Sequence, residues 1–421
     1  MILTGGTVVA RAIAALASPV ISRIYPPSDF GLFSVFFSLT TALIIVAALN
    51  YEAAIPLPKD DEFGLNIMGL SFCLLFLNTL ICGLVLFLFG HSITVKLGAP
   101  QLQVYLWLIP LSLLGGGAYF ILNSWAIRVQ AFRSLAKRRI IQSAFQVLTQ
   151  LSVPLLIRGP FGLLLGDTVG RASGSITLAL DTHASMESRN IRLSVRRMAE
   201  AAVRYKKFPF FGTASVLAHA SFSVLPALLM TRFFGLQEAG WYALVNQVLG
   251  VALGLIGLAV AQVYLSNAVQ LARSSPLQLR SLFLKTSRAA LLAGIVPLGL
   301  LIPFGPQLFG FVFGARWVEA GRYAQLLALP FLAMLTVGPV YPTLTVLERQ
   351  DWQFAADALG MLIMILGMRY AHSMGLSGRW AVGAYGISVM ITYLSLFVLA
   401  LFAIQRRSIK SSSTGTPKLI E

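Results

Sequence analysis

The chain has 421 residues, of which 57% are hydrophobic and only 11% are charged, and its formal net charge is +17. Soluble domains contain about 45–50% apolar and about 25% charged residues, so this composition excludes a soluble globular protein. The basic residues are spread along the edges of apolar segments with no nucleic-acid-binding fold behind them, which excludes nucleic acid as a partner.

Apolar segments of about 20 residues recur along the whole chain, which is typical of transmembrane helices. They predict an all-α polytopic membrane protein, with about 12 transmembrane helices in two six-helix lobes around a central cleft. We expect the first segment to be retained rather than cleaved as a signal peptide, because it lacks a basic start and Arg11 interrupts it. The predicted spans are 2–22, 31–51, 66–89, 102–124, 140–157, 161–180, 209–231, 240–264, 289–312, 323–346, 354–371 and 381–404.

The distribution of positive charge predicts the orientation of these spans. The even-numbered connections and the C-terminal tail carry 22 of the lysines and arginines, whereas the opposite side carries 8. The positive-inside rule therefore places both termini in the cytoplasm. The predicted organisation is an N-terminal lobe at 1–181, a basic cytoplasmic linker with an amphipathic helix on the anionic inner leaflet at 182–207, a C-terminal lobe at 208–404 and a cytoplasmic tail at 405–421.

A nine-residue pattern occurs once in each predicted lobe. Residues 23–31 and 232–240 share an arginine, an apolar residue, an aromatic residue, three variable positions, an acid, any residue and a glycine. Each copy joins the first two spans of its lobe, which indicates a parallel repeat with its axis along the membrane normal. The charged members are candidates for the rim or gate of the cleft, or else they cap and pair within their own turns: Arg23, Asp29, Arg232 and Glu238.

Polar residues form a stripe along the first span. Thr4, Thr7, Arg11, Ser18 and Ser22 fall within an arc of about 60° on a regular helix. A charge near the middle of a membrane is costly unless it faces protein or water. The stripe therefore either lines a hydrated cleft, with Thr7, Arg11 and Ser18 as candidate cargo contacts, or serves as helix–helix packing with Arg11 reaching to the surface.

Two further polar groups lie inside predicted spans. Ser215, His219 and Ser223 stand four residues apart in span seven and are candidate cargo contacts or packed core residues. In span six, Asp167 and Arg171 are spaced for an internal ion pair, and Arg171 is also a candidate cargo contact.

Glu52 follows the second span, within a Tyr-Glu pair. It is a candidate either for pairing with a basic residue to close a cytoplasmic gate or for carrying a coupling proton, and the sequence leaves both open.

Several short segments together resemble one protein family. They are R-I-Y-P-P-S-D-F-G at 23–31 with Y-E at 51–52, R-Y-K-K-F-P at 204–209, F-G-A-R-W-V-E-A-G-R-Y-A-Q-L-L-A at 313–328 and V-L-E-R-Q at 346–350. In this order they are similar to bacterial polysaccharide-biosynthesis (Wzx-type) flippases, a branch of the multidrug/oligosaccharidyl-lipid/polysaccharide exporter superfamily.

The resemblance implies a non-enzymatic transporter of the bacterial cytoplasmic (inner) membrane, with no cofactor and no metal. Its cargo would be an undecaprenyl-diphosphate-linked oligosaccharide, moved to the outer leaflet by alternating access. Arg11 would be the first candidate for the diphosphate, because arginine offers paired donors to phosphate oxygens. Other implied partners are membrane lipids, H⁺ or Na⁺ as a coupling ion, and further polysaccharide-assembly proteins.

Two other functions are compatible with a polytopic membrane protein. A multidrug exporter of the same superfamily would expel organic cations, for which a buried arginine is poorly suited. A polytopic glycan polymerase or transferase needs large external loops, whereas the predicted external connections are short. The sugar and the polymer, whether O-antigen, capsule or exopolysaccharide, stay open.

Overall fold

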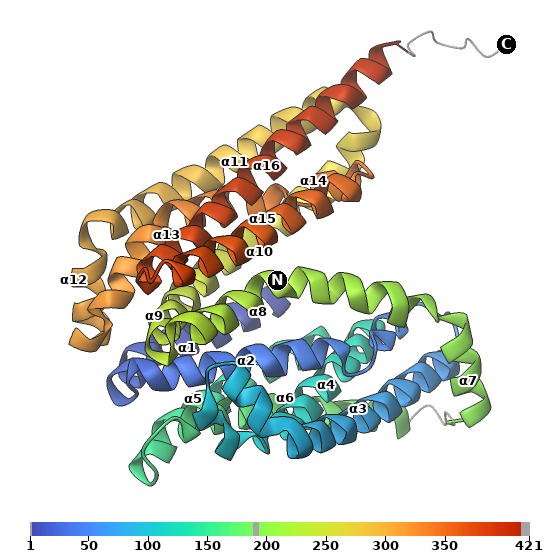
Figure 1. The fold of residues 1–421 in the computed structure, drawn as a ribbon. Helices are drawn as coiled ribbons and strands as arrows, with labels where there is room; N and C mark the ends of the chain where they lie inside the picture. The colour runs from blue at the N-terminus through green and yellow to red at the C-terminus, as the bar shows by residue number, and fades with distance from the viewer. Residues whose placement is uncertain (1, 188–192, 414–421) are drawn as a thin grey trace, which may run out of the picture. The chain divides into compact units, whose positions relative to one another are not determined.

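The computed structural model describes residues 2–187 and 193–413, and this part of the chain is helical, with no β-strand (Figure 1). Short 3-10 and π-helical turns join several of the helices. The α-helices are α1 (Ile2–Ile24), α2 (Pro27–Val46), α3 (Asp61–Lys96), α4 (Leu108–Arg128), α5 (Phe132–Ser152), α6 (Phe161–Glu187), α7 (Val195–Arg204), α8 (Thr213–Phe234), α9 (Leu236–Val245), α10 (Val251–Ser274), α11 (Pro276–Gly299), α12 (Leu301–Phe313), α13 (Val318–Val337), α14 (Thr343–Val346), α15 (Gln350–Ser373) and α16 (Gly378–Ser413).

Every predicted span falls on one of these helices or on two in succession. Eight helical segments in the described part are long and apolar enough to cross a membrane by themselves. Predicted spans eight, nine and ten each cover two consecutive helices, which divide at a π-helical turn (Asn246–Gly250), at Leu300 and at Gly338–Val340. The chain is therefore an all-α, multi-pass membrane protein, as predicted.

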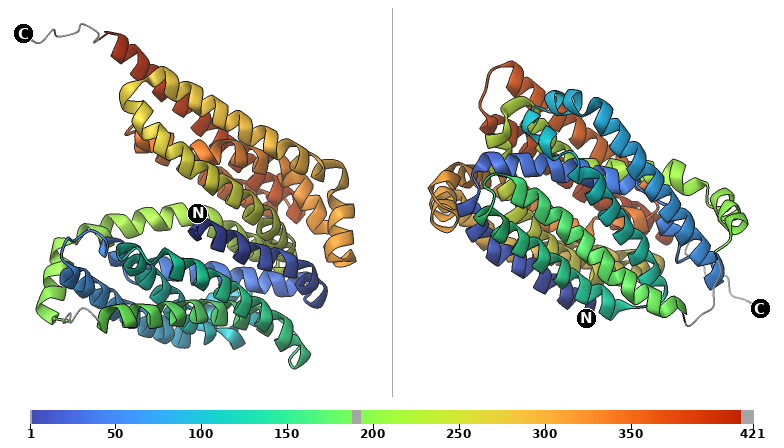
Figure 2. Two further views of the ribbon diagram at one scale, coloured as in Figure 1. Left: turned by 180° about the vertical axis from the view of Figure 1, so that it is seen from behind. Right: turned by 90° about the horizontal axis from the view of Figure 1, so that it is seen from below.

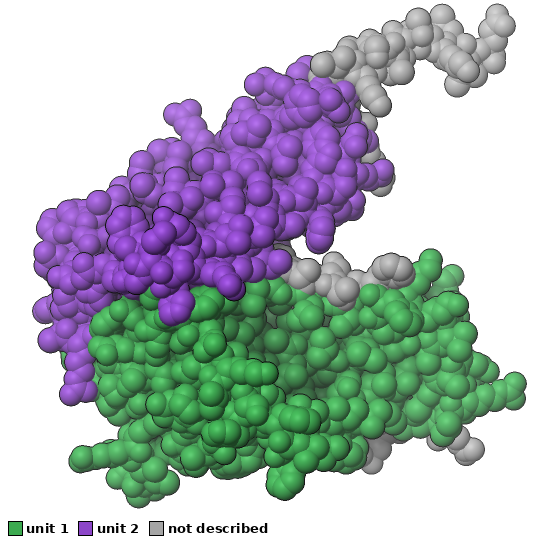
Figure 3. Space-filling view, viewed as in Figure 1, with its two compact units in different colours: residues 1–243 green, residues 244–421 purple. Residues whose placement is uncertain are grey.

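The chain divides into two compact units, residues 1–243 and 244–421 (Figure 3). Helix α8 belongs to the first unit because it packs along α2, whereas the sequence pattern assigns it to the second lobe. The predicted division into an N-terminal lobe at 1–181 and a C-terminal lobe at 208–404 stays a prediction.

A glycine stripe on α6 holds α5 and α6 together in the first unit (Figure 2). A Cβ atom on Gly166, Gly170 or Gly174 would meet Gln150, Gln146 or Gln142 of α5, respectively. Small residues at four-residue spacing let transmembrane helices approach closely. A hydrogen bond joins α6 to α4 as well: the hydroxyls of Ser112 on α4 and Thr168 on α6 lie 2.7 Å apart.

The two copies of the nine-residue pattern meet within the first unit. A Cβ on Gly31 of α2 would overlap the carbonyl oxygen of Leu236, and a Cβ on Gly240 of α9 would overlap that of Pro27. Each glycine thus packs on the residue four positions before the other glycine. The contact is reciprocal, like that between two copies related by a local two-fold axis.

The core of the second unit lies among α10, α11, α14 and α16. It contains Tyr264, Phe283, Leu344 and Leu396, all at most 2% exposed. The hydroxyl of Tyr264 lies 2.6 Å from that of Thr343. These two buried hydroxyls are therefore paired with each other, which suits a segment that lies inside a membrane.

Candidate functional site

Helix α5 begins eight residues before the predicted span, so two arginines of the predicted cytoplasmic connection lie within this helix. They are Arg138 and Arg139, and their placement on the cytoplasmic side stays a prediction. Helix α4 ends where Gln130 takes a left-handed backbone conformation (φ 58°), and α5 starts two residues later. Lysine, arginine and alanine are good helix formers, so a basic segment can extend a transmembrane helix.

Arg138 is the most deeply buried charged residue among the described side chains of the first unit, with 1% of its surface exposed. Its guanidinium carbon lies 3.5 Å from the centroid of the Tyr119 ring on α4. Within the described part of the chain, Nε and Nη1 have no hydrogen-bond partner. A buried charge whose donors are unused is costly, so an anionic partner would be favourable at this position.

Arg138 belongs to a group of basic residues on α1 and α5. The positive charge of Arg139 acts on both Arg11 and Arg138, and Arg139 also donates a hydrogen bond to the hydroxyl of Thr7. Ser143 of α5 donates to the carbonyl of Ala10 at 2.7 Å, which fixes the two helices against each other. The first unit thus concentrates positive charge where α1 and α5 pack together.

The polar stripe of α1 faces the interior of the protein. Thr7, Ser18 and Ser22 are buried, and Arg11 is half-buried. The hydroxyl of Ser22 donates to the carbonyl of Pro19 at 3.0 Å. These positions favour the helix-packing alternative for the hydroxyl residues, and a direct cargo contact by Thr7 or Ser18 stays a prediction.

Arg171 and Asp167 form the internal ion pair that their spacing predicts, with Nε and Oδ2 2.7 Å apart. Both side chains are largely buried, and the guanidinium of Arg171 lies 5.1 Å from the centroid of the Phe37 ring. The charge of Arg171 is therefore balanced within α6.

The polar residues of span seven are only partly described. The side chains of Ser215 and His219 lie outside the part that the structure describes. Ser223 is exposed, and its hydroxyl donates to the carbonyl of Ala220 at 2.9 Å. Their role as cargo contacts stays a prediction.

The four rim candidates occupy equivalent places in the two copies of the repeat. Asp29 lies in the first turn of α2 and Glu238 in the first turn of α9, where a carboxylate is favourable beside the helix N-terminus. Arg23 and Arg232 are exposed near the last turns of α1 and α8. This arrangement agrees with the capping alternative, and their part in gating stays a prediction.

Glu52 lies in a 3-10 turn (Tyr51–Ala54) that packs on α3 and α4. Its Oε2 atom is buried without a hydrogen-bond partner among the described residues, and burial raises the pKa of its carboxyl to about 7. Its neighbour Tyr51 anchors the turn by donating to the carbonyl of Ala202 at 3.0 Å. These properties suit the proton-carrying alternative better than an ion pair.

The raised pKa of Glu52 predicts how stability depends on pH. Between pH 4.5, the ordinary pKa of a glutamate, and about 7 the folded protein holds a proton that the unfolded chain has lost. The melting temperature should therefore fall as pH rises through this window. Glu52→Gln should flatten the profile, whereas the exposed control Glu348→Gln should leave it unchanged. Identical pH profiles for Glu52→Gln and the wild type would contradict the assignment.

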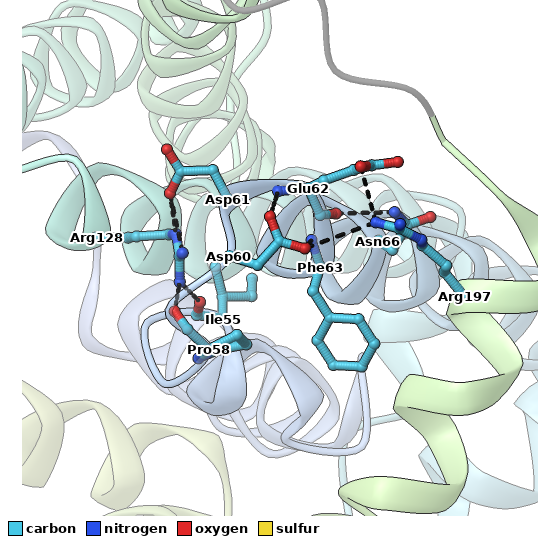
Figure 4. Close-up of polar contacts among 9 residues, drawn as sticks. All are labelled: Ile55, Pro58, Asp60, Asp61, Glu62, Phe63, Asn66, Arg128 and Arg197. Carbon is cyan, nitrogen blue, oxygen red and sulfur yellow. Dashed lines mark hydrogen bonds and ion pairs between the residues drawn. The ribbon is translucent and has the colours of Figure 1, made fainter.

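Two arginines bind a cluster of acidic residues at the start of α3 (Figure 4). Arg128 of α4 contacts Asp61, with Nη2 and Oδ1 2.9 Å apart, and its Nη1 donates to the carbonyls of Ile55 at 2.9 Å and Pro58 at 2.7 Å. A Cβ on Gly64 would lie 2.9 Å from the guanidinium carbon, so this glycine leaves space for the arginine. Arg128 thereby ties the chain before α3 to the end of α4.

The second arginine joins α7 to the same cluster (Figure 4). Arg197 lies 2.8 Å from the carboxylate of Glu62 and 3.6 Å from that of Asp60. Asp60 also caps α3 by accepting from the backbone N–H of Glu62 at 3.1 Å, and Asn66 accepts from that of Ser194 at 2.7 Å. The predicted amphipathic helix is thus present at Val195–Arg204 and is attached to α3.

The sequence pattern relates these arginines only to the orientation of the chain in the membrane. Arg128, Arg138 and Arg197 were counted with the cytoplasmic charge, and nothing in their spacing indicates their partners. The sequence around Arg138 is equally compatible with a loop and with a helix, so it does not indicate that this residue is buried. In the described part of the chain, no group of three or more histidines, cysteines or carboxylates is placed to hold a metal ion.

Comparisons with known proteins relate this geometry to a family. Residues 20–322 match the family described as "Polysaccharide biosynthesis protein". The succinoglycan biosynthesis transport protein ExoT of Rhizobium meliloti (strain 1021) is 24% identical over 315 residues, which are 74% of this chain and 61% of that protein. The alignment therefore spans less than two thirds of the relative.

Solved structures share the fold at low identity. The inward-facing conformation of a multidrug resistance MATE family transporter of the MOP superfamily has a TM-score of 0.75 and 13% identity, over 96% of each chain. The lipid II flippase MurJ in an inward closed conformation has a TM-score of 0.76 and 12% identity, over 98% of this chain and 90% of that one. At this identity both likenesses show the fold alone: this chain folds like these two proteins.

Proposed function

We propose that this chain, which belongs to the family of polysaccharide biosynthesis proteins, is a flippase for a lipid-linked oligosaccharide. Its cargo would be an undecaprenyl-diphosphate-linked repeat unit, moved from the inner to the outer leaflet of the bacterial cytoplasmic membrane by alternating access. The family match over residues 20–322 carries the proposal, because it links the chain to polysaccharide assembly. The MOP-superfamily fold supplies a scaffold for transport.

The buried arginines of the first unit support an anionic cargo. A diphosphate cannot cross hydrocarbon without replacing the hydrogen bonds that water gives it. Among the described residues, two nitrogen donors of Arg138 have no hydrogen-bond partner, and the positive charge of Arg139 acts on both Arg138 and Arg11. We assign Arg138 as a ligand of the diphosphate, with Arg11 and Arg139 as further candidates, since guanidinium groups offer paired donors to phosphate oxygens.

Energy coupling is part of the proposal. Glu52 is the first candidate for a coupling proton, because burial raises the pKa of its carboxyl to about 7 and leaves Oε2 without a partner. The other candidates are Asp167, His219 and Glu238, with Na⁺ as the alternative ion. Asp167 is the least favoured of these because it is paired with Arg171.

The test is the leaflet location of the lipid-linked repeat unit in a strain that lacks this chain. Intact repeat units on the cytoplasmic leaflet, together with loss of surface polymer, are expected. In the complemented strain, Arg138→Gln should lower export roughly 10- to 100-fold, because a hydrogen bond to a charged group contributes about 1.5–3 kcal/mol. Arg138→Lys should keep part of the activity, and the control Arg196→Gln, which removes an 89% exposed arginine side chain of α7, should keep all of it.

Other results would overturn the proposal. Normal polymer in the deletion strain would remove the flippase function, and missing repeat units would indicate an earlier biosynthetic step. A multidrug exporter, the alternative function, would instead change the resistance to organic cations without trapping repeat units. If Arg138→Gln lowered the amount of protein in the membrane, the arginine would be structural; we expect its level and melting temperature to be maintained, because the variant removes an unpaired buried charge.

A further inference from the structure

An apolar groove runs between α15 and α16 in the second unit. Its volume is about 600 Å³, which lies within the roughly 300–1,000 Å³ typical of small-molecule sites. It is lined by Trp352, Ala355, Ala356, Leu359, Leu394, Ser395, Val398 and Leu399. Ser395 is the one lining residue with a hydroxyl group, and the other seven are alanine, leucine, valine or tryptophan. A molecule that fills the groove therefore has to contact it with hydrocarbon.

The groove follows one face of each helix. Residues 352, 355 and 359 lie on a common face of α15, and residues 394 and 398 lie on a common face of α16, because positions three and four apart are neighbours on a helix. Leu359, Leu394 and Val398 are each about half exposed. This face is therefore open to an apolar partner along its length.

Both faces end at an arginine beside the same indole ring. The guanidinium of Arg349, just before α15, lies 5.0 Å from the centroid of the Trp352 ring, and that of Arg406, late in α16, lies 6.0 Å from it. Trp352 stacks on Phe402 with ring centroids 6.0 Å apart, and Arg406 lies 4.4 Å from Phe402. One end of the apolar groove thus carries two cations on an aromatic platform.

The two arginines retain their donors for a ligand. In the described part of the chain, neither forms an ion pair within 4.0 Å, although Glu348 and Asp351 flank Arg349 in the sequence. Arginine presents five N–H donors in a plane, and stacking on an aromatic ring leaves their edges open. Phosphate oxygens are the acceptors that suit such an arrangement.

We propose that this groove binds one anionic phospholipid, with an acyl chain between α15 and α16 and its phosphate between Arg349 and Arg406. Trp352 would lie at the level of the headgroup, where tryptophan is enriched at membrane interfaces. The predicted orientation places this end of both helices at the cytoplasmic leaflet, whose anionic lipids attract basic residues. The charge at one end matches a phosphate lipid better than it matches a helix of a partner protein. The proposal is independent of the cargo assigned above.

Quenching of Trp352 by lipids with brominated chains tests this site in the purified full chain. The signal is the difference between the wild type and Trp352→Phe, which subtracts the other five tryptophans. Brominated phosphatidylglycerol should quench at lower concentration than brominated phosphatidylcholine. Arg406→Gln should lower that preference roughly 5-fold, since a basic residue near an anionic surface contributes about 1 kcal/mol. The control Arg407→Gln removes the same charge from the next position and should keep the preference.

The hydrocarbon half of the site is tested separately. Ala355→Phe should fill the groove and weaken quenching by both lipids, with an unchanged melting temperature showing that the fold is retained. Equal quenching by the two lipids, or equal effects of Arg406→Gln and Arg407→Gln, would overturn the proposal. Displacement by inorganic phosphate alone would show that the groove plays no part, and displacement by polyprenyl phosphate at lower concentration than phosphatidylglycerol would assign the groove to an isoprenoid lipid instead.

Discussion

Alanine at Gly31 or Gly240 should lower the stability of the protein by roughly 3 kcal/mol or more, at or above the upper end of the range for overpacked sites. A Cβ on Gly31 would lie 2.7 Å from the carbonyl carbon of Leu236, and one on Gly240 would lie 2.6 Å from that of Pro27. These neighbours are backbone atoms, which cannot rotate aside as a side chain can. The overlap can therefore be removed only if α2 and α9 move apart, which weakens the packing along both helices.

The measurement is the melting temperature of the purified protein in detergent. A loss of roughly 5 °C or more is expected, because 1 kcal/mol corresponds to about 2–4 °C in domains of 150–250 residues. The matched control is Gly383→Ala in α16, where an added Cβ would meet no atom within 4 Å. The control should keep or raise the melting temperature, since alanine is the better helix former by up to about 1 kcal/mol. Equal melting temperatures for Gly31→Ala and Gly383→Ala would contradict the close contact.

Arg128→Ala should lower stability by roughly 2–4 kcal/mol, because a buried carbonyl without a donor costs about 1–3 kcal/mol. The side chain of Arg128 is 7% exposed and donates to the carbonyls of Ile55 and Pro58 as well as to Asp61. The side chain of Asp61 is 46% exposed, so water can replace much of the ion pair that the carboxylate loses with Arg128. Most of the effect should therefore come from the two carbonyls.

The loss for Arg128→Ala should amount to roughly 4–16 °C in melting temperature. Arg128→Lys should fall between the wild type and the alanine variant, because one ammonium group cannot reproduce the planar fork of the guanidinium. Lys59→Ala is the control, since it removes an exposed cation from the same segment. A melting temperature for Arg128→Ala equal to that of Lys59→Ala would show that the network contributes nothing.

The sequence determined the membrane class and the approximate positions of the spans, and its short motifs indicated the family. Apolar length sets the class and the spans, because a helix has to match the thickness of the hydrocarbon and satisfy its own backbone hydrogen bonds. The structure places the acid of each repeat in the first turn of a helix, at Asp29 and Glu238, whereas the predicted spans begin two residues later. Helical spacing predicted the pair between Asp167 and Arg171, which stand one helical turn apart.

The tertiary structure alone decided which polar residues meet across helices. The partners of Arg128 and Arg197 lie on α3 and the chain before it, far away in the sequence, and no periodicity encodes such a distance. Spacing placed Thr7 and Ser18 on one face of α1, but only packing against neighbouring helices shows that this face is buried. The buried position of Arg138 became visible only when α5 was seen to begin at Phe132, because a basic segment is locally compatible with a loop, a surface helix or a buried helix. The neighbours of the segment decide whether it is a loop, a surface helix or a buried helix. Those neighbours are set by contacts between distant parts of the chain, which the sequence pattern does not contain.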